Sequence, residues 1–422
     1  MAMRVLRQRD FRRLLGAHVV SQVGTGVTSL AIPLIAVTVL HASPLMIGLL
    51  AAASTVPLLL LGLPAGVWVD RRKRKPLMVG GDIGRFALLM LLPISAVFGW
   101  LSYPLLFAIV ALVGCLTVVF DIASQSYVTS LLDREDLVGG NSMFHSSYAV
   151  GEIIGPGIAG TLVSVFKAPI AVTVDAVSFL VSGILIAGIR HQEVAPESKP
   201  TGVTALRAEL TEGLRAVRDT PVLRTLGLAT GVWNLFEGAR DAMLILFITQ
   251  TLHISAQGTG IIYSIAAAGW LVGSMLTGIA AAKFGLGRAI MLGALLVIPC
   301  ELLIPLAGGP PLLAGAMVAA GYFLSGVAGP IYDVNQYSLR QAITPDHLQG
   351  RVSSVLRVII RGTEPLGALL GGLIAEWLGL RGAMWAAVFG PPIAIALIWF
   401  SPVRRMQVMP GADSVANSSE FR

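Results

Sequence analysis

Charged residues are scarce in this chain, and their scarcity excludes an ordinary water-soluble protein. Asp, Glu, Lys and Arg make up only 13% of the 422 residues, whereas 55% are hydrophobic; soluble domains carry about 25% charged residues. The same figures exclude a disordered chain, which combines high charge with low hydrophobicity. Cysteine is nearly absent. Cys115 and Cys300 both lie in apolar runs, so we expect neither a disulfide scaffold nor a cysteine-based metal site.

The apolar residues gather in runs long enough to cross a bilayer, which takes about 20 residues per helix. Twelve runs occur, at 12–40, 44–69, 76–99, 103–130, 140–166, 168–189, 221–252, 258–282, 287–307, 311–340, 350–378 and 382–401. Within each run the apolar residues are continuous and do not alternate with polar ones, which favours helices over barrel strands. The sequence therefore predicts an all-α membrane protein with twelve transmembrane helices.

Lys and Arg are concentrated in every second connection between these runs. They crowd the N-terminus, the loop at 71–75 and the central stretch at 190–220, whereas the alternate loops hold only Lys167 and Arg381. Cytoplasmic loops carry such an excess of positive charge, so we expect both termini in the cytoplasm. The net charge of +7 follows from these loops, and no nucleic-acid partner is expected.

The polar central stretch divides the chain into two halves. The predicted parts are a cytoplasmic N-terminus at 1–11, a six-helix bundle at 12–189, a cytoplasmic linker at 190–220, a second six-helix bundle at 221–402 and a cytoplasmic tail at 403–422. Within the linker, Leu206, Leu210, Leu214 and Val217 recur at helical spacing between charged residues. This pattern predicts an amphipathic helix lying along the membrane surface.

The two halves also look alike in sequence. A shift of 212 residues places His41 on His253, Gly26 on Gly238, Gly48 on Gly260 and Gly66 on Gly278, and a shift of 211 places Gly160 on Gly371. Two parallel six-helix repeats are typical of transporters that work by alternating access. The sequence therefore predicts two pseudo-symmetric bundles.

Three stretches resemble the major facilitator superfamily. Residues 66–75 (GVWVDRRKRK) are similar to its loop motif between helices 2 and 3, and residues 151–160 (GEIIGPGIAG) to its antiporter motif on helix 5. Residues 338–352 (SLRQAITPDHLQGRV) resemble the branch that contains macrolide-efflux proteins and enterobactin exporters. The resemblance implies the twelve-helix major facilitator fold in the inner membrane of a bacterium.

In that family the loop motif holds the cytoplasmic side shut. The resemblance assigns this gate to Gly66, Asp70, Arg71 and Arg74, with Asp70 at the start of helix 11 near 351–354 and the two arginines beside acids at 133–136. Lys73 stands where the family has glycine, which puts the tight turn in question. A solvated cluster of positive charge is the alternative interpretation.

In the antiporter motif, Gly151, Gly155 and Gly160 remove side chains, so that another helix can approach closely. Pro156 removes a hydrogen-bond donor and tends to bend the helix. By resemblance, helix 5 would pack against helix 8 and seal the bundle against proton leakage. Plain helix packing with no directional meaning is the alternative.

Ionisable residues inside a membrane are costly, so each is a functional candidate that needs an interior partner or water. The candidates for proton coupling are Asp121, Glu152, Glu237, Arg240, Asp241, Asp333, Arg361 and Glu364. Glu237, Arg240 and Asp241 share one helix face, so Arg240 can neutralise one acid while the other takes up protons. Static salt bridges are the alternative for these residues. For Asp82 and Arg85 we expect a structural role, because they lie close to the cytoplasmic face. Asp175 and Glu301 have no assignment.

For substrate contact we expect aromatic and polar side chains lining an apolar cavity, which suits bulky amphipathic ligands. The candidates are Trp233, Phe236, Tyr263, Trp270, Tyr332, Asn335 and Gln336. Together with the resemblance, they predict a proton-coupled exporter of a drug, antibiotic, siderophore or secreted metabolite, acting as a monomer without cofactor or metal. An uncoupled facilitator or lipid flippase is the alternative. The motifs of membrane enzymes and ATP-driven pumps are missing.

Overall fold

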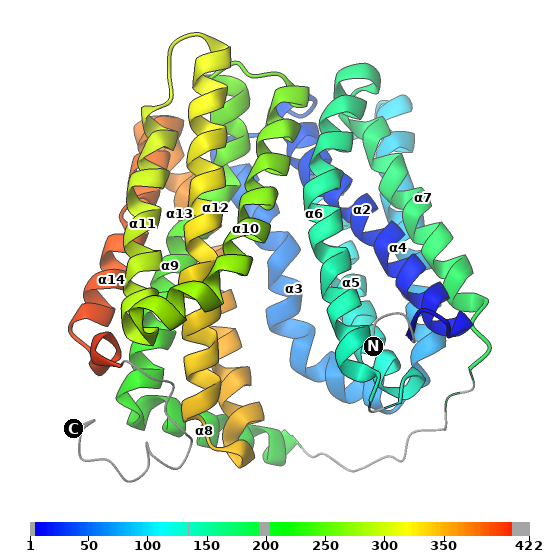
Figure 1. Cartoon of the computed structure of the whole chain (residues 1–422). Coiled ribbons are helices and arrows are strands. Elements are labelled where there is room, and N and C mark those ends of the chain that lie inside the picture. The colour runs from blue at the N-terminus through cyan, green and yellow to red at the C-terminus, as the bar shows by residue number, and fades with distance from the viewer. Residues whose placement is uncertain (1–4, 134, 192, 194–202, 407–422) are drawn as a thin grey trace. The chain divides into compact units, whose positions relative to one another are not determined.

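The computed structural model describes residues 5–133, 135–191, 193 and 203–406, and every regular element in this part of the chain is helical. Figure 1 labels the helices. Their bounds are α2 Arg9–Thr38, α3 Pro44–Asp70, α4 Arg74–Val97, α5 Tyr103–Leu131, α6 Leu137–Phe166, α7 Ala168–Ala187, α8 Val203–Asp219, α9 Pro221–Leu246, α10 Ala256–Phe284, α11 Leu286–Leu306, α12 Pro311–Ile343, α13 Gln349–Ala387 and α14 Gly390–Trp399. A short π-helix at Phe247–Thr251 extends α9.

Each predicted apolar run corresponds to a helix, with one rearrangement near the C-terminus. Gly379, with φ of 75°, breaks α13 between the eleventh and twelfth runs. The twelfth run is then divided again before α14, where Pro391 and Pro392 lack the backbone N–H groups that would continue the helix. Ten helical segments of the described chain are long and apolar enough to span a membrane. The helix α9, which carries Glu237, Arg240 and Asp241, is not among them.

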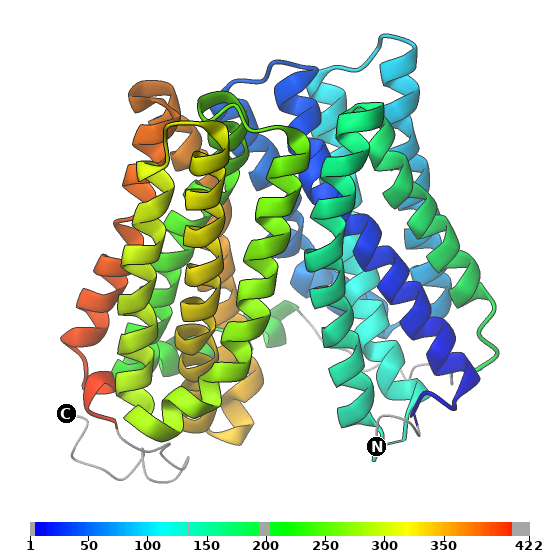
Figure 2. The ribbon, with the colours of Figure 1, turned by 45° about the horizontal axis from the view of Figure 1, so that its top comes forward.

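Helices form two compact units, and each unit includes a short segment from the other half of the sequence. The first comprises 1–43, 53–200 and 254–264, and the second comprises 44–52, 201–253 and 265–422. In the first unit α2 packs against both α6 and α7, and α4 packs against α5 and α7 (Figures 1 and 2). In the second, α9 packs against α13 and α14, and α11 against α12.

The sequence repeat is matched by repeated backbone conformation. His41 and His253 both adopt positive φ, at 50° and 54°, immediately before the next helix. Few residues other than glycine adopt this region, and histidine is among those enriched there. The same unusual turn therefore occurs at both positions related by the shift of 212 residues.

Close helix contacts repeat with the same shift. A methyl group at Gly48 would overlap the carbonyl oxygen of Ala368, and one at Gly260 would overlap that of Pro156. Likewise, Gly160 approaches Ala256 and Gly372 approaches Pro44. The contacts therefore pair Gly160 with Gly372, so the prediction that Gly371 is its equivalent was wrong by one residue.

The linker helix α8 lies where amphipathic periodicity predicts it, but its packed face differs from the predicted stripe. Val217 is buried in the core of the second unit, whereas Leu214 is 54% exposed. Gly213 lies against the backbone of Arg351, whose guanidinium group forms an ion pair with Glu212 at 2.5 Å. The helix α8 is therefore held against the start of α13 by a glycine contact and an ion pair. Leu206 and Leu210 lie outside the described side chains.

Candidate functional site: an arginine among three carboxylates

The side chain of Arg240, on α9, is surrounded by three carboxyl groups. Its Nη2 lies 3.0 Å from Glu237 Oε1, its Nε lies 2.9 Å from Asp241 Oδ1, and its Nη1 bonds Glu301 of α11. Glu237 meets Arg240 because the two lie three residues apart on one helix, whereas Asp241 is the next residue in the sequence. Glu301 comes from another helix, and helical spacing on α9 could not have indicated it.

A tyrosine completes the group, and the sequence did not single it out. The hydroxyl group of Tyr322, on α12, donates to Asp241 Oδ1 at 2.5 Å. The Arg240 guanidinium lies 5.0 Å from the centre of the same ring, within the range of a cation–π contact. Three helices of the second unit, α9, α11 and α12, thus contribute to one cluster, which we call the Arg240 cluster (Glu237, Arg240, Asp241, Glu301 and Tyr322).

Burial is uneven across the Arg240 cluster. The side chains of Arg240 and Glu301 are 10% and 5% exposed, whereas those of Glu237 and Asp241 are 42% and 51% exposed. With every group ionised, the cluster would hold two more negative than positive charges. Because excess charge is costly inside a membrane, such a site favours binding a proton or another cation. Among the described residues, no three His, Cys, Asp or Glu side chains are arranged to hold a metal ion.

The other acids predicted in the second unit lie apart from this arginine. Arg361 and Glu364 form an ion pair at 3.4 Å within α13, with side chains 60% and 36% exposed. Asp333 is half-buried on α12 and interacts electrostatically with Arg340 and Arg361, and also with Glu237 of the Arg240 cluster. The predicted residues of α9 are therefore brought together around Arg240, and Asp333 lies within electrostatic reach of both Glu237 and Arg361.

In the first unit, the structure places the predicted acids in different surroundings. Asp121 is half-buried on α5, and Glu152 is exposed on α6. Asp82 and Arg85, expected to be structural, form a buried pair at 2.5 Å with side chains 0% and 3% exposed. The Arg85 guanidinium lies between the rings of Phe120 and Phe179, at 4.2 and 4.0 Å from their centres. This packing indicates a fixed pair.

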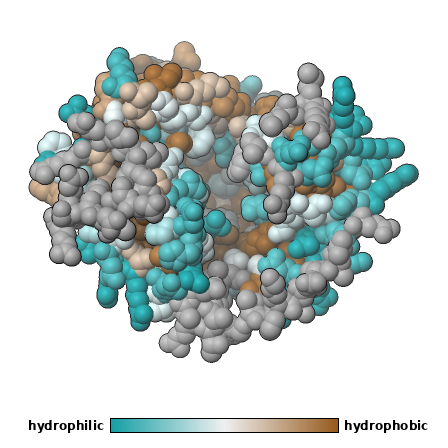
Figure 3. Space-filling model, turned by 60° about the horizontal axis from the view of Figure 1, so that its bottom comes forward, coloured by the Kyte–Doolittle hydropathy of each residue, from teal (hydrophilic) through white to brown (hydrophobic). Residues whose placement is uncertain are grey.

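The gate motif residues divide between an exposed and a packed group. Asp70 and Arg71 are exposed at the end of α3. Figure 3 shows that hydrophilic residues gather on the face that comes forward when the bottom of Figure 1 is turned toward the viewer. Lys73 has φ of −66°, so the loop does not need the glycine that the family has there. Arg74 meets Glu193 of the linker at 4.0 Å, a partner that the sequence did not indicate. No close contact surrounds the Cβ position of Gly66.

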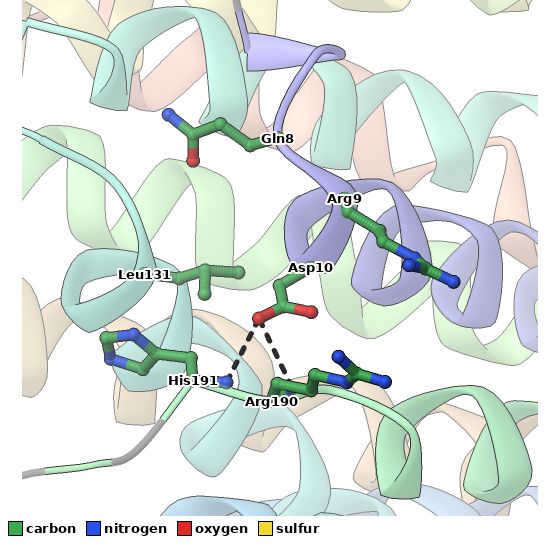
Figure 4. Close-up of a pocket in the computed structure, with 6 residues that line it drawn as sticks. All are labelled: Gln8, Arg9, Asp10, Leu131, Arg190 and His191. Atoms are coloured by element: carbon green, nitrogen blue, oxygen red, sulfur yellow. Dashed lines mark hydrogen bonds between the residues drawn. The ribbon is translucent and has the colours of Figure 1, made fainter.

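The first residues of the linker are anchored on the first unit. The Glu193 carboxylate accepts hydrogen bonds from the backbone N–H groups of Arg74 and Lys75 at 3.0 and 3.2 Å. Asp10 accepts from those of Arg190 and His191 at 3.2 and 3.0 Å, in a pocket that Figure 4 shows. The cluster of basic residues at 71–75 therefore contributes two backbone groups to holding the linker.

The antiporter motif packs against two helices. Gly151 and Gly155 lie against α2, where a methyl group at Gly155 would be 2.5 Å from the Cα atom of Gly26. Gly160 and Pro156 contact the first turns of α10, at Ala256 and Gly260. The eighth predicted helix, at 258–282, corresponds to α10. The expectation that the motif packs against it therefore holds for the last part of the motif only. Its first two glycines serve the crossing of α2 and α6.

Four of the predicted cavity residues are buried inside the second unit. Trp233 and Tyr332 stack at 4.8 Å with an interplanar angle of 7°, and the Tyr332 hydroxyl bonds Thr230 at 2.9 Å. Asn335 and Gln336 are 6% and 3% exposed. Core packing covers these four side chains in this structure, and their contact with a substrate stays a prediction. Phe236 and Tyr263 are half-buried, and Trp270 is 49% exposed.

The sequence pattern of the Major Facilitator Superfamily matches residues 14–362 and 241–416. The chain belongs to this family. It is therefore a membrane transporter and not an enzyme.

Relatives and solved structures agree with this assignment. The chain is 28% identical to the multidrug efflux pump Tap of Mycolicibacterium fortuitum, over 88% of this chain and 91% of Tap. It is 24% identical to macrolide efflux protein A of Streptococcus pyogenes, over 80% and 83% of the two chains. A nucleoside transporter NupG variant superposes with a TM-score of 0.78 at 11% identity, covering 92% of this chain and 99% of that one. This structural likeness establishes the fold.

Proposed function

We propose that this transporter exports bulky amphipathic compounds in exchange for protons, by alternating access of its two halves. The observation that carries the proposal is the Arg240 cluster, in which one guanidinium group faces three carboxyl groups within a membrane bundle. Relatives named as a multidrug efflux pump and a macrolide efflux protein support export as the direction. We further propose cytoplasmic termini in a bacterial inner membrane, on the basis of the positive loops.

In the proposed cycle, the half-exposed acids Glu237 and Asp241 exchange protons, while Glu301 stays paired with Arg240. The buried pair is shielded from water, so its charges have no route to exchange. An acid that gains water and loses its contact with Arg240 is free to take up a proton. Its return to Arg240 favours the ionised form and expels that proton. Asp333 and then Glu364 are the next candidates for proton exchange.

For substrate contact, Phe236, Tyr263 and Trp270 are the strongest candidates, because their side chains are partly exposed. Aromatic rings in an aliphatic wall suit bulky amphipathic molecules. We also propose that Gly66, Asp70, Arg71 and Arg74 take part in the cytoplasmic gate. The anchoring of Arg74 on Glu193 would link this gate to the linker.

Transport by the purified protein in liposomes with an imposed pH gradient tests the proposal. A fluorescent amphipathic cation serves as substrate, and a pH-sensitive dye trapped in the lumen reports protons. We expect the gradient to drive substrate movement and each movement to carry protons in the opposite direction. Glu237→Gln and Asp241→Asn should abolish the gradient dependence, whereas Asp219→Asn, an exposed surface change, should not. Exchange that ignores the gradient would identify a facilitator or lipid flippase instead.

A further inference from the structure

The first unit contains a buried carboxyl group that the proposed transport cycle does not use. Asp175, on α7, is 1% exposed and lies between α2 and α4. No ion pair within 4.0 Å involves it in the described structure, although two charged residues of α4, Asp82 and Arg85, face it. We propose that Asp175 is a proton-binding site of the first unit, which holds its proton at neutral pH independently of the Arg240 cluster.

Charge balance is the first argument. Among the described residues, Arg85 is the one cation that interacts with Asp175. Its Nη2 is already bonded to Asp82 at 2.5 Å, and its guanidinium group lies between two phenylalanine rings. Asp82 receives a second hydrogen bond from Ser182 at 2.7 Å. Asp82 therefore has the partners that an ionised carboxylate needs. Asp175 has no partner of comparable strength. A buried carboxyl group without a charged partner favours its neutral, protonated form.

Hydrogen-bond geometry is the second argument. The Ser178 oxygen lies 2.8 Å from the backbone carbonyl oxygen of Asp175 and 3.1 Å from its Oδ1. A serine hydroxyl carries one hydrogen, so it cannot donate fully to both acceptors. With a proton on the Asp175 carboxyl group, Ser178 donates to the carbonyl oxygen and accepts from the acid. Both contacts are then satisfied.

An unsatisfied hydroxyl group points to the same site. Thr28, on α2, is 8% exposed and faces Asp175, yet its Oγ1 makes no hydrogen bond of good geometry. Gly24, one turn earlier on α2, provides the room for the carboxyl group. A methyl group there would lie 2.6 Å from Asp175 Oδ1. The site is therefore built by α2 and α7 together, with the Thr28 hydroxyl able to donate to the carboxyl oxygen that does not carry the proton.

The surroundings contain no further described charge that would replace the proton. α2 faces Asp175 with Gly24 and Thr28, and α4 with Asp82 and Arg85. On α6, which also touches α7, Glu152 is exposed and is not among the groups that interact with Asp175. Loss of the proton would leave an uncompensated charge where α7 packs against Gly24 of α2. The packing of the first unit therefore becomes sensitive to alkaline pH.

Asp175 and Asp82 form a matched pair for the test, since both are buried acids on neighbouring helices. Asparagine resembles a protonated aspartic acid, so Asp175→Asn should melt at the temperature of the wild type near neutral pH. Asp82→Asn should melt far lower, because it leaves Arg85 buried without its partner. Thermal unfolding of the full-length protein in detergent measures both. An Asp175→Asn protein as unstable as Asp82→Asn would overturn the proposal.

Two further measurements do not require the Asp175→Asn protein to fold. The wild type should show an infrared band of a protonated carboxylic acid that disappears as pH rises, together with a fall in melting temperature. Thr28→Val removes a hydroxyl that would stabilise the ionised form, so the band should persist to higher pH. Absence of the band at neutral pH would contradict the proposal. So would recovery of alkaline stability by added Na⁺ but not K⁺, which would identify a sodium site instead.

Discussion

Arg240 of α9 and Glu301 of α11 form an ion pair whose side chains are 10% and 5% exposed. Glu237 and Asp241 contact the same guanidinium group from the more exposed side. A buried charge that loses its partner is far less stable than one that keeps it. Each member of the pair therefore requires the other, and the pair is an electrostatic centre of the second unit.

Removing one member of this pair should cost more than removing both. Arg240→Met should destabilise the protein by about 3–5 kcal/mol, because it leaves Glu301 buried without a cation. Arg240→Met combined with Glu301→Leu should regain most of that loss, since Glu237 and Asp241 retain access to water. Melting temperatures in detergent compare the three proteins. A double variant less stable than the single one would refute the assigned pairing.

Tyr322 should tune the proton affinity of the Arg240 cluster. Its hydroxyl donates to Asp241 at 2.5 Å, which stabilises the ionised carboxylate. Without that hydroxyl, the ionised carboxylate loses a stabilising hydrogen bond. Tyr322→Phe should therefore move the pH of half-maximal transport upward by about one unit, which corresponds to about 1.4 kcal/mol.

Tyr337→Phe is the matched control for this experiment. Tyr337 is on the same helix, α12, but is 50% exposed, and its hydroxyl accepts only from Gln341 at 3.3 Å. Its pH profile should coincide with that of the wild type. Equal shifts in the two variants would assign the effect to general changes in α12 and remove Tyr322 from the coupling site.

Much of the fold could be predicted because membrane helices are marked by local sequence. Long apolar runs, positive loops and the shift of 212 residues are all visible without coordinates, as is the shared face of Glu237, Arg240 and Asp241. Helical spacing does not report how one helix is rotated against its neighbour. For that reason the sequence could not assign Glu301 or Tyr322 to Arg240.

The same limitation applies to three other contacts. Tyr332 looks like a cavity residue because it is aromatic and close to polar positions, but rotation of α12 places it against Trp233 in the core. Glu193 looks like an ordinary linker acid, and only the folded backbone brings it to the start of α4. Gly151 and Gly155 are identified by their motif, whereas their partner, α2, is set by tertiary packing.

The crossing of α2 and α6 should tolerate no added side chain. A methyl group at Gly155 would lie 2.5 Å from the Cα atom of Gly26, so the helices must separate to admit it. Gly155→Ala should destabilise the protein by about 1–3 kcal/mol. Gly80→Ala is the control, because no atom lies within 4 Å of its Cβ position. It should be neutral or slightly stabilising, since alanine favours helix. Equal melting temperatures for the two variants would contradict the observed crossing.

Glu193 should protect the first turn of α4. Its carboxylate accepts from two backbone N–H groups, those of Arg74 and Lys75, which have no partner inside the helix. Replacing a side chain that caps such groups costs about 0.5–2 kcal/mol. Glu193→Gln keeps the shape but loses the charge that favours a helix N-terminus, so amide hydrogen exchange at 74 and 75 should accelerate.

Hydrogen exchange followed by mass spectrometry measures this effect locally. The expected acceleration is about 2- to 30-fold for that range of free energies, confined to the first turn of α4. Asp219→Asn is the comparison, because Asp219 meets only Arg218 and both side chains are largely exposed. If exchange at 74 and 75 is equally fast in both variants, Glu193 does not hold α4. The linker would then be anchored to the first unit through Asp10 and through Lys75, whose Nζ donates to the carbonyl oxygen of Ile189.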